Sequence, residues 1–541
     1  MDQTLPRPVT ITEMVENITR QKGDQTAIVY LGQHITFNEL LERSQRVADG
    51  LRRLGIGEGD RVSLWLPAVP AWLITYIALC RLGAVAVATN TKFRSSEVQD
   101  IVSRSQAKAI IMWPGFKHID FEGILSDIDP TALTALQTVI LYSEDKTEPA
   151  HHILGRNTVS YHALEQSPPY TADHATPESG CNIFTTSGTT KAPKLVYHKQ
   201  SATAGHLYDI NRAFGLDQPG KSVLHMIPFC GVWGFDQGMM TLAGGSTLYI
   251  MPFFDPAEAA RLIQAHRITH TSASDEAVRC LLEVNDTPVP FPSLELIGFA
   301  AVGGGSSQDL VLEATRRGLT LRGLYGSSEL GALFSLQSDT LAPEDRTQGG
   351  GICVNPETQV RTRDKQSGNI LPHGERGEIE IKTPSRMVGY LNNPEATQTA
   401  FTEDGFFKTG DLGYTRDDGS WVFLSRLGDA IRLSGFLVSP AEIEGYIETH
   451  PAVSEAQVVG VQQARKIWLC AFIIPADANK LDNQLLRQYC EKGMAKYKVP
   501  QHFEPIDAFP VTLSANGNKI QRAKLRDMAE SIMRRSLAPA T

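Results

Sequence analysis

The sequence predicts an α/β protein in which a large N-terminal domain, residues 1–427, precedes a small C-terminal domain, residues 428–541. Helix-like and strand-like patterns alternate along the chain, which is typical of parallel strands covered by helices. A chain of 541 residues is also too long for one hydrophobic core. A strand-like segment at residues 421–424 closes the larger part, and the chain after residue 427 has the length of an ordinary small domain.

The alternation is clearest near the N-terminus. Helical spacing of apolar residues alternates there with short apolar runs, and the pattern repeats three times. It predicts helices at residues 37–54, 71–82 and 95–105, and strands at residues 61–66, 84–88 and 109–112.

Two further helices have marked starts. Asp255 and Ser439 are predicted N-cap residues, because each precedes a proline at the first helical position. Glu258 and Glu442 stand three residues after these caps, where a glutamate closes a capping box. The sequence therefore predicts that helices begin directly after Asp255 and Ser439.

The longest mostly apolar run, residues 68–80, predicts a buried helix. It contains Pro70 and Thr75, meets Arg81, and is too short to cross a bilayer. The first residues lack the basic and apolar pattern of a signal peptide. The seven cysteines lie far apart without metal or redox spacing, so we expect free thiols in a cytoplasmic protein.

Composition narrows the classes of partner. Apolar residues make up 42% of the chain and charged residues 21%, as in soluble globular proteins. The net charge of −9 argues against a general nucleic-acid-binding protein, because phosphate contacts need clustered Lys and Arg. A chain with this negative net charge can still have local clusters of basic residues.

One phosphate-binding pattern is misleading. Residues 215–222, Gly-Leu-Asp-Gln-Pro-Gly-Lys-Ser, match the P-loop pattern letter for letter. A P-loop lies between a strand and a following helix, so that the helix N-terminus faces the phosphate. Here the order is reversed, since residues 204–214 predict a helix and residues 223–227 predict a strand. We therefore interpret this match as a surface turn.

Five separated motifs carry a more specific signal. They are Thr186-Ser187-Gly188-Thr189-Thr190-Lys191-Ala192-Pro193-Lys194, Tyr325-Gly326-Ser327-Ser328-Glu329, Thr409-Gly410-Asp411, Ser425-Arg426-Leu427-Gly428-Asp429 and Asn516-Gly517-Asn518-Lys519. Each motif is only moderately specific, but five in this order are not expected by chance. The order resembles that of the acyl-adenylate-forming (AMP-binding) superfamily of acyl-CoA synthetases, peptide-synthetase adenylation domains and luciferases.

The resemblance covers nearly the whole chain, which is most similar to a free-standing bacterial-type acyl-CoA synthetase. It implies an N-terminal domain of helix-covered sheets that binds ATP and an acid. It also implies a small, mobile α+β C-terminal domain that carries a catalytic lysine.

The first motif surrounds a glycine with hydroxyl and backbone N–H donors, which suit phosphate oxygens. The resemblance implies that this loop holds the β- and γ-phosphates of ATP, through Thr186, Ser187, Gly188, Thr189, Thr190 and Lys194. Lys191 and Leu195 replace two glycines of the family pattern, so we expect a stiffer loop and a further phosphate contact from Lys191. Taken alone, the motif is also compatible with an ordinary Ser/Thr-rich surface loop.

The adenine ring and the reacting groups are assigned to two further segments. Glycines have no side chain, so a flat ring can approach the backbone at Gly303, Gly304 and Gly305. By resemblance Tyr325 and Gly326 belong to the ATP site, with Tyr325 stacked on adenine. Ser328, where the family has Thr, contacts the acid carboxylate or the α-phosphate, and Glu329 holds Mg²⁺, a hard cation that prefers oxygen ligands. Without its context, an exposed glutamate at a helix start is the alternative interpretation of Glu329.

The last motifs supply single residues with assigned roles. By resemblance Asp411 accepts the ribose hydroxyls and Arg426 reaches ribose or phosphate. Gly428 occupies the hinge position, where free φ and ψ angles suit a rotation, and Gly435 admits the pantetheine arm of coenzyme A (CoA). Lys519 is the catalytic lysine, whose ammonium stabilises charge on the carboxylate and the α-phosphate. Surface charges and a plain loop glycine are the alternative interpretations.

The resemblance places the acid pocket around Phe229, Cys230, Gly231 and Trp233. Gly231 stands where the family often has His, so we expect a wider pocket or an open path to it. No Asp stands beside Cys230 to pair with an ammonium group, so an α-amino acid is not expected. Residues 271–275, Thr-Ser-Ala-Ser-Asp, are unusually polar, which indicates either a polar group on the acid or helix capping by Asp275, and we favour capping.

The sequence therefore predicts a carboxylate–CoA ligase that uses ATP, Mg²⁺ and CoA and forms acyl-AMP as intermediate. Loading of a carrier protein is the alternative within the same fold, although no carrier domain follows Thr541. A luciferase-like oxygenase is not favoured by any motif. An inactive nucleotide-binding scaffold is the alternative of another class, and the assigned charged residues argue against it. We expect a moderately sized, mainly apolar aliphatic, alicyclic or aryl acid, and the oligomeric state, a homodimer included, stays open.

Overall fold

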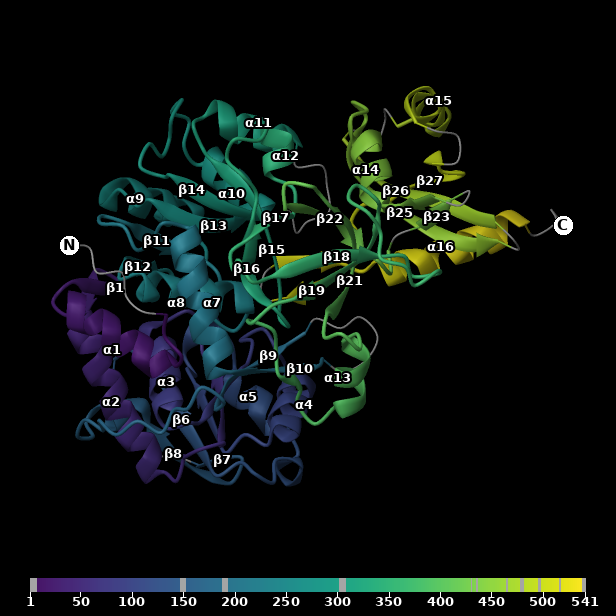
Figure 1. Ribbon diagram of the computed structural model, residues 1–541. Coiled ribbons are helices and arrows are strands. Elements are labelled where there is room, and N and C mark those ends of the chain that lie inside the picture. Colours follow the sequence, from purple (N-terminus) through teal and green to yellow (C-terminus); the bar gives the residue numbers. More distant parts are fainter. Residues whose placement is uncertain are drawn as a thin grey trace.

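The computed structural model describes residues 7–145, 152–186, 193–300, 308–429, 431–433, 436–463, 466–476, 481–494, 498–514 and 517–537. Two large sheets with helices between and around them form the N-terminal part, and a three-stranded sheet with its own helices forms the smaller C-terminal part (Figure 1). The predicted α/β architecture with a small second domain is confirmed.

The first large sheet has 13 described strands and is parallel in its middle. Neighbours from β15 to β1 run parallel, and the strands on either side are antiparallel. In order, the strands are β18 (Gln359–Arg363), β19 (Gly377–Lys382), β21 (Phe407–Thr415), β22 (Trp421–Arg426), β17 (Gly350–Cys353), β16 (Gly331–Leu336), β15 (Leu321–Ser327), β14 (Leu296–Ala300), β13 (His270–Ser274), β11 (Ser222–His225), β12 (Thr247–Ile250), β1 (Thr26–Tyr30) and β2 (Gln33–Thr36).

The second large sheet has nine described strands. Neighbours from β9 to β8 run parallel, and both ends of the sheet are antiparallel. In order, the strands are β20 (Gly389–Tyr390), β10 (Leu195–Lys199), β9 (Gly180–Thr185), β4 (Val85–Ala88), β3 (Arg61–Trp65), β5 (Ala109–Met112), β6 (Thr138–Leu141), β8 (Arg156–Ser160) and β7 (His152–Ile153).

A layer of helices fills the space between the two sheets. It consists of α1 (Ile11–Lys22), α2 (Phe37–Arg53), α3 (Pro70–Arg81), α7 (Gln200–Ala213) and α8 (Val232–Ala243), whose apolar side chains pack with strands of both sheets in one core. Every residue of α3 and α8 is buried, which explains why the run at residues 68–80 is apolar on all sides.

Other helices cover the outer faces. The first sheet packs against α9 (Pro256–His266), α10 (Asp275–Glu283) and α11 (Gln308–Arg316), and the second against α4 (Ser95–Ser105) and α5 (Phe121–Ser126). Shorter helices lie at the periphery: α6 (Tyr161–Glu165), α12 (Pro343–Arg346), α13 (Pro394–Ala400) and the 3₁₀ turns η1 (Phe116–His118) and η2 (Pro130–Ala132).

The predicted alternation near the N-terminus is confirmed, with boundaries correct to within one residue, by α2, β3, α3, β4, α4 and β5. The match to the P-loop pattern does lie between a helix and a strand, since α7 ends at Ala213 and β11 begins at Ser222. The predicted strand at residues 421–424 is part of β22, which runs on to Arg426.

The two marked helix starts are confirmed, but the capping boxes are wrong. Asp255 accepts a hydrogen bond from the Glu258 backbone N–H at 2.8 Å, while the Glu258 side chain pairs with Arg261. Ser439 makes no capping bond to its own helix. Its Oγ lies 3.4 Å from the Leu424 carbonyl oxygen, and the Glu442 carboxylate is taken up by ion pairs.

The C-terminal part is a small α+β unit. Its sheet joins β25 (Val453–Gln463), β26 (Lys466–Pro475) and β27 (His502–Pro505). Alternate residues of β25 and β26 pack against α14 (Pro440–Glu448) and α15 (Asn483–Gly493) on one face and α16 (Arg522–Leu537) on the other. Two strand pairs, β23 (Ile431–Leu433) with β24 (Phe436–Val438) and β28 (Val511–Ser514) with β29 (Gly517–Ile520), flank this unit.

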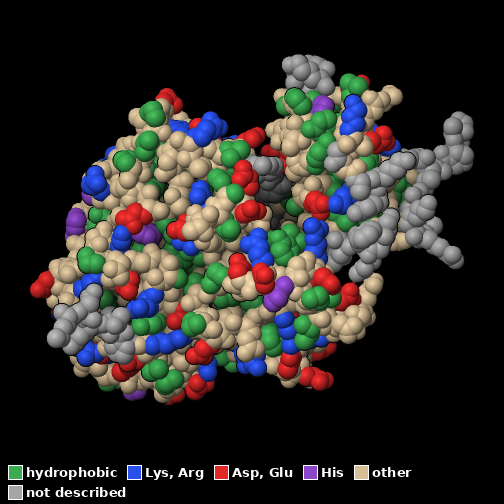
Figure 2. Space-filling view, turned by 45° about the horizontal axis from the view of Figure 1, so that its top comes forward, with side chains coloured by type: hydrophobic (Ala, Val, Ile, Leu, Met, Phe, Trp, Pro, Cys, Tyr) green, Lys and Arg blue, Asp and Glu red, His purple; other side chains and the backbone are tan. Residues whose placement is uncertain are grey.

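The two parts meet across a recess that Figure 2 shows on one face of the molecule. Basic and acidic side chains are interspersed over that face. Among the described residues, one ion pair joins the parts directly, between Arg376 and Glu442 at 3.2 Å, and Lys498 of the C-terminal part also contacts Glu442.

None of the helices within the described ranges has the length and apolar character needed to cross a bilayer. All seven cysteines lie in described segments, and all are free thiols.

Candidate active site

The phosphate-loop motif sits at the end of a hairpin of two strands. β9 and β10 pair antiparallel, with Thr185 opposite Leu195. Beyond this pair the Thr186 N–H donates to the Lys194 carbonyl oxygen at 3.0 Å, and the Lys194 N–H donates to Thr186 Oγ1 at 3.1 Å. The predicted Ser187, Gly188, Thr189 and Thr190 lie outside the described residues, as does Lys191.

Leu195 has a structural reason to replace a family glycine. Its side chain is 1% exposed and packs with Val85, Val87, Ile101 and Ile183 in a small core beneath the loop. A buried leucine fixes the start of β10, which a glycine at this position would not do. This supports the expectation of a stiffer loop.

The segment around Glu329 follows β15, which has a bulge between Tyr325 and Ser327. Glu329 is half-buried, and its Oε1 accepts a hydrogen bond from the Tyr390 hydroxyl at 3.0 Å. The ring of Tyr390 also carries the Lys194 ammonium over its face, with Nζ 4.4 Å from the ring centroid. Tyr390 thus brings together side chains from the first two motifs.

The sequence analysis missed Tyr390. Its two contacts depend on the pairing of β20 with β10, which joins segments separated by about 190 residues. No local pattern around Tyr390 distinguishes it from an ordinary core tyrosine. Predicting its role would have required knowing that β20 pairs with β10.

A buried histidine holds the neighbouring main chain. His198 of β10 donates from Nε2 to the Ser328 carbonyl oxygen at 2.7 Å. Burial lowers the pKa of His198, so the ring is neutral and keeps its proton for this bond. The predicted Ser328 is therefore positioned through its backbone.

The residue predicted to bind the ribose, Asp411, has a buried carboxylate with two protein partners. Asp411 is 1% exposed and lies opposite Arg426 in the β21–β22 ladder. Its Oδ2 accepts from the Tyr325 hydroxyl at 2.5 Å, and its Oδ1 lies 2.9 Å from Arg426 Nη1. Burial raises the pKa of Asp411, and the Arg426 guanidinium opposes this shift. The structure therefore brings three predicted residues into one cluster.

The Tyr325 ring is part of that cluster. It meets Trp421 edge to face, with ring centroids 4.6 Å apart, and Phe423 at 5.8 Å. The neighbouring Gly326 is exposed, and a Cβ built on it would lie 2.4 Å from the Ala332 Cα. A side chain at Gly326 would force β15 and β16 apart.

The turn that follows Glu329 is fixed by a buried ion pair. Gly331 has φ +92°, and a Cβ there would lie 2.5 Å from His206 Nε2. His206 donates to the Ala332 carbonyl oxygen at 2.7 Å and lies 3.6 Å from Asp236, whose Oδ2 accepts the Ala332 N–H. Helices α7 and α8 therefore hold both polar groups of Ala332.

The predicted acid-pocket residues lie where a buried loop enters α8. Phe229, Cys230 and Trp233 are buried, and Gly231 is the N-cap of α8. Phe229 stacks on His225 with centroids 4.2 Å apart. Burial lowers the pKa of His225 to about 3 and raises the pKa of Cys230 to about 12, so both groups are neutral. The surroundings of this loop therefore favour apolar ligand groups.

Two further predictions concern the Asp275 helix cap and the glycine triplet. The helix cap assigned to Asp275 is wrong, because Ser274 is the N-cap of α10 and accepts the Ala277 N–H at 3.3 Å. The triplet Gly303, Gly304 and Gly305 lies outside the described residues.

Gly428 lies in the turn after β22, beside the small domain. Its carbonyl oxygen accepts from Arg526 of α16 at 2.9 Å, and Arg526 also pairs with Asp429 at 2.5 Å. A Cβ built on Gly428 meets no described atom within 4 Å. This conformation therefore does not itself require a glycine.

The remaining predicted residues of the C-terminal part are only partly described. Lys519 lies in β29 with its backbone opposite Thr512 of β28. The Lys519 side chain and Gly435 lie outside the described parts. The structure thus gives the strand that carries Lys519 and not the position of its ammonium group.

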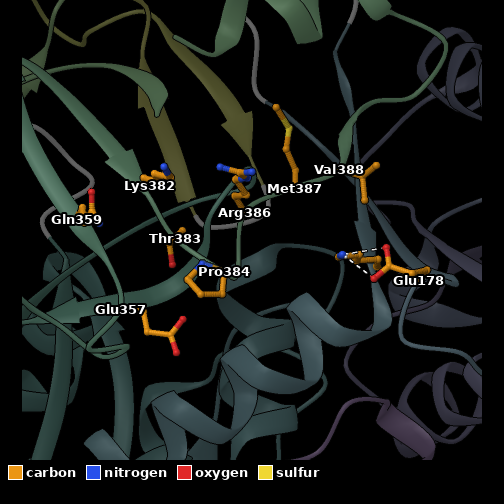
Figure 3. A pocket seen from close by; sticks show the side chains of 10 residues that line it. Glu178, Glu357, Gln359, Lys382, Thr383, Pro384, Arg386, Met387 and Val388 are labelled. Carbon is orange, nitrogen blue, oxygen red and sulfur yellow. Dashed lines mark hydrogen bonds and ion pairs between the residues drawn. The ribbon is translucent and has the colours of Figure 1, made fainter. Parts of the chain in front are cut away.

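A separate pocket of about 470 Å³ is lined by Lys382 of β19 and by residues 383, 384 and 386–388, which lead to β20 (Figure 3). Met387 and Val388 form part of its wall, and the Met387 N–H donates to the Glu329 carbonyl oxygen at 2.7 Å. Lys199 and Glu178, which also line this pocket, form an ion pair at 2.9 Å. None of the predicted site residues within the described ranges lines this pocket.

The carboxylate, histidine and cysteine side chains determine whether the site could hold a metal ion. The described residues hold no cluster of three or more His, Cys, Asp or Glu side chains that could bind one. Mg²⁺ in nucleotide sites needs only one or two carboxylates, because phosphates and water supply its other ligands. The half-buried carboxylate of Glu329 fits that role.

The fold and the motif-bearing strands define a two-domain α/β protein of the adenylate-forming type. The AMP-binding enzyme family matches residues 15–391, and the AMP-binding enzyme C-terminal domain family matches residues 442–516. The chain belongs to the AMP-binding enzyme family.

Individual relatives align over nearly the full length. A long-chain-fatty-acid–CoA ligase of Bacillus subtilis is 27% identical, covering 97% of this chain and 96% of the relative. The human mitochondrial medium-chain acyl-CoA ligase ACSF2 is 26% identical, covering 96% of this chain and 88% of the relative. ATP-bound MatB from Rhodopseudomonas palustris has a similar structure, with a TM-score of 0.81, 25% identity, and coverage of 96% and 99% of the two chains.

Proposed function

We propose that this chain is an ATP-dependent carboxylate–CoA ligase. The acid carboxylate attacks the α-phosphorus of ATP, and pyrophosphate leaves. The CoA thiol then attacks the acyl carbon of the acyl-AMP, so that acyl-CoA forms and AMP leaves. The observation that carries the proposal is the alignment over 96% and 97% of this chain with two relatives that are acyl-CoA ligases.

The proposal divides the work between the two domains. Residues 1–427 bind ATP and the acid, and residues 428–541 rotate about Gly428 between the two half-reactions. The position of Gly428, directly after β22 and bonded through its carbonyl oxygen to α16, supports this boundary.

The N-terminal motifs take the nucleotide. Lys194 and the loop before it bind the β- and γ-phosphates, while Tyr325 and the glycine triplet bind adenine. Asp411 and Arg426 take the ribose. Because Asp411 already accepts a bond from Tyr325, a ribose hydroxyl would share this carboxylate. The strongest support is that Tyr325, Asp411 and Arg426 form one hydrogen-bonded and ionic cluster.

Glu329 is the proposed Mg²⁺ ligand and Ser328 the proposed contact to the reacting carboxylate. When bound, Mg²⁺ lowers the charge on the departing pyrophosphate. Lys519 stabilises charge in the first half-reaction, and Gly435 lines the pantetheine path. These roles rest on the motifs.

The proposed acid is mainly apolar, with Phe229, Cys230, Gly231 and Trp233 at its pocket. The neutral and largely aromatic surroundings of Phe229 support this class. One ligase relative is named for medium-chain acyl-CoA and the other for long-chain fatty acids. We retain the prediction of a cytoplasmic enzyme, and a homodimer stays open.

An acid panel tests the function. Purified enzyme is incubated with ATP, Mg²⁺ and each acid, and pyrophosphate release is measured with and without CoA. Acyl-CoA, identified by mass, is expected for at least one medium-chain or ring-bearing acid. Pyrophosphate exchange without any CoA thioester would favour a carrier-protein acceptor. Failure of exchange with every acid would favour the inactive scaffold.

A further inference from the structure

We propose that Tyr390 is a positioning residue that aligns the metal-binding carboxylate of Glu329 with the phosphate-binding ammonium of Lys194. The inference deepens the proposed function, because it requires ATP and a divalent cation at this site. It concerns a side chain that no motif assigned.

Two contacts of one side chain carry the proposal. The Tyr390 hydroxyl donates to Glu329 Oε1 at 3.0 Å, and the Tyr390 ring lies under Lys194 Nζ at 4.4 Å. Tyr390 is 7% exposed, whereas Lys194 is exposed and Glu329 is half-buried. A fixed aromatic side chain therefore orients two charged groups that face solvent.

Tyr390 is itself held by its neighbours. It lies in β20, where Tyr390 pairs with Val196 of β10, and its N–H donates to Thr397 Oγ1 at 2.9 Å. Three residues earlier, the Met387 N–H bonds the Glu329 carbonyl oxygen. One short segment thus holds both the main chain and the side chain of Glu329.

The chemistry of each contact suits a supporting role. The Tyr390 hydroxyl is the donor of its bond to Glu329, because an ionised carboxylate can only accept. Its bond engages one carboxylate oxygen, and the other lone pairs remain for a hard cation. Hydrogen bonds of this kind fix the orientation of metal-ligating carboxylates. An ammonium over a ring keeps its outer face open to an anion.

The chain offers a matched control. Tyr30 of β1 is also 7% exposed, and its hydroxyl donates to Glu144 Oε1 at 2.5 Å. Tyr30→Phe therefore removes a part-buried tyrosine–glutamate bond of the same type at a place with no assigned site residue.

The first test measures metal binding rather than turnover. Mn²⁺ is titrated into full-length enzyme with the non-hydrolysable analogue α,β-methylene-ATP, and free Mn²⁺ is followed by electron paramagnetic resonance. Tyr390→Phe is expected to weaken Mn²⁺ binding about tenfold or more. Wild type and Tyr30→Phe are expected to bind alike, and melting temperatures check that each variant is folded.

A double-mutant cycle separates positioning from general loss of structure. In a Glu329→Gln background, Tyr390→Phe should cost little further Mn²⁺ affinity, because the carboxylate that it orients is gone. Full additivity of the two substitutions would overturn the proposal.

The ring contact has its own test. With EDTA present, binding of α,β-methylene-ATP should be unchanged in Tyr390→Phe and about two- to fivefold weaker in Tyr390→Leu, which also removes the face under Lys194. If the two variants bind α,β-methylene-ATP equally, the Tyr390 ring does not position Lys194.

Different results would overturn the role of Tyr390 and the ligase function. Wild-type Mn²⁺–nucleotide binding with an unchanged Tyr390→Phe variant would overturn the role of Tyr390 and leave the ligase function intact. Absence of nucleotide binding in the wild type would overturn the proposed function and the inference with it.

Discussion

At the scale of single residues, the most constrained charge in the candidate site is the Asp411 carboxylate. It is almost fully buried, yet it faces a hydroxyl on one oxygen and a guanidinium on the other. A buried carboxylate needs such partners, because losing them would leave an uncompensated charge in a poorly solvated place. Its partners therefore stabilise the folded protein, in addition to the ribose-binding role proposed for this cluster.

Lys519 is expected to act in one half-reaction only. Lys519→Ala should lower acyl-AMP formation about a hundredfold or more, because an electrostatic stabiliser of the first transition state is lost. Formation of acyl-CoA from supplied acyl-AMP should persist. Lys524→Ala serves as control, since it removes an exposed lysine of α16 five residues away. Equal losses in both half-reactions would contradict this role.

Gly231 is expected to set the size of the acid. Gly231→His adds a ring at the N-cap of α8, beside buried Cys230 and Trp233. Overpacking a formed site costs about 1–3 kcal/mol, which corresponds to about tenfold or more in specificity. The largest accepted acids should lose kcat/KM, while acetate and propionate are unaffected or improve. A uniform change across a chain-length and ring-size series would mean that Gly231 does not line the pocket.

At the scale of elements, the helices and strands near the N-terminus could be predicted because their signals are local. Apolar spacing and short β-rich runs identified α2, β3, α3, β4, α4 and β5 with nearly correct ends. The capping boxes failed because basic side chains compete for the glutamates: Arg261 of the same helix pairs with Glu258, while Arg376 and Lys498, distant in sequence, pair with Glu442. Tyr390 was missed because its partners, Glu329 and Lys194, are distant from it in sequence.

The link between α7, α8 and β16 should make stability depend on pH. Burial alone lowers the pKa of His206, but Asp236 and the Ala332 carbonyl group outweigh it, so the pKa is raised. A raised histidine pKa stabilises the folded state below about pH 6.5, and this contribution is lost as the pH rises through the folded-state value.

His206→Gln should therefore lower the melting temperature most at about pH 5.5, and the difference from wild type should shrink towards about pH 9. His502→Gln is the control, because it removes a histidine from a partly exposed pair with Glu504. A difference that stays constant over this range would show that His206 is not protonated in the folded protein.

At the scale of the whole molecule, a single ion pair joins the two domains in the part of the chain that the structure describes. The Arg376–Glu442 ion pair is partly exposed on both sides, and such pairs contribute roughly 0–1 kcal/mol. The C-terminal unit has its own apolar cores on both faces of its sheet. It can therefore rotate as a body without exposing its core, which a two-step reaction with one mobile domain requires.

Gly428→Ala is the control for the hinge. A Cβ at this position meets no described atom within 4 Å, so the alanine variant should fold and melt like wild type. Its two half-reactions, pyrophosphate exchange and thioester formation from supplied acyl-AMP, should stay near wild-type rates.

Gly428→Pro should separate the two half-reactions. Proline fixes φ near −65° and also restricts Leu427 before it, so the turn can no longer take two conformations. The enzyme should then be held in one domain orientation, and the half-reaction that needs the other orientation should fall about tenfold or more behind its partner. Each half-reaction is measured alone under single-turnover conditions, with the melting temperature as a check on folding. Wild-type rates in both would mean that the rotation does not pass through Gly428, and the boundary between residues 427 and 428 would have to move.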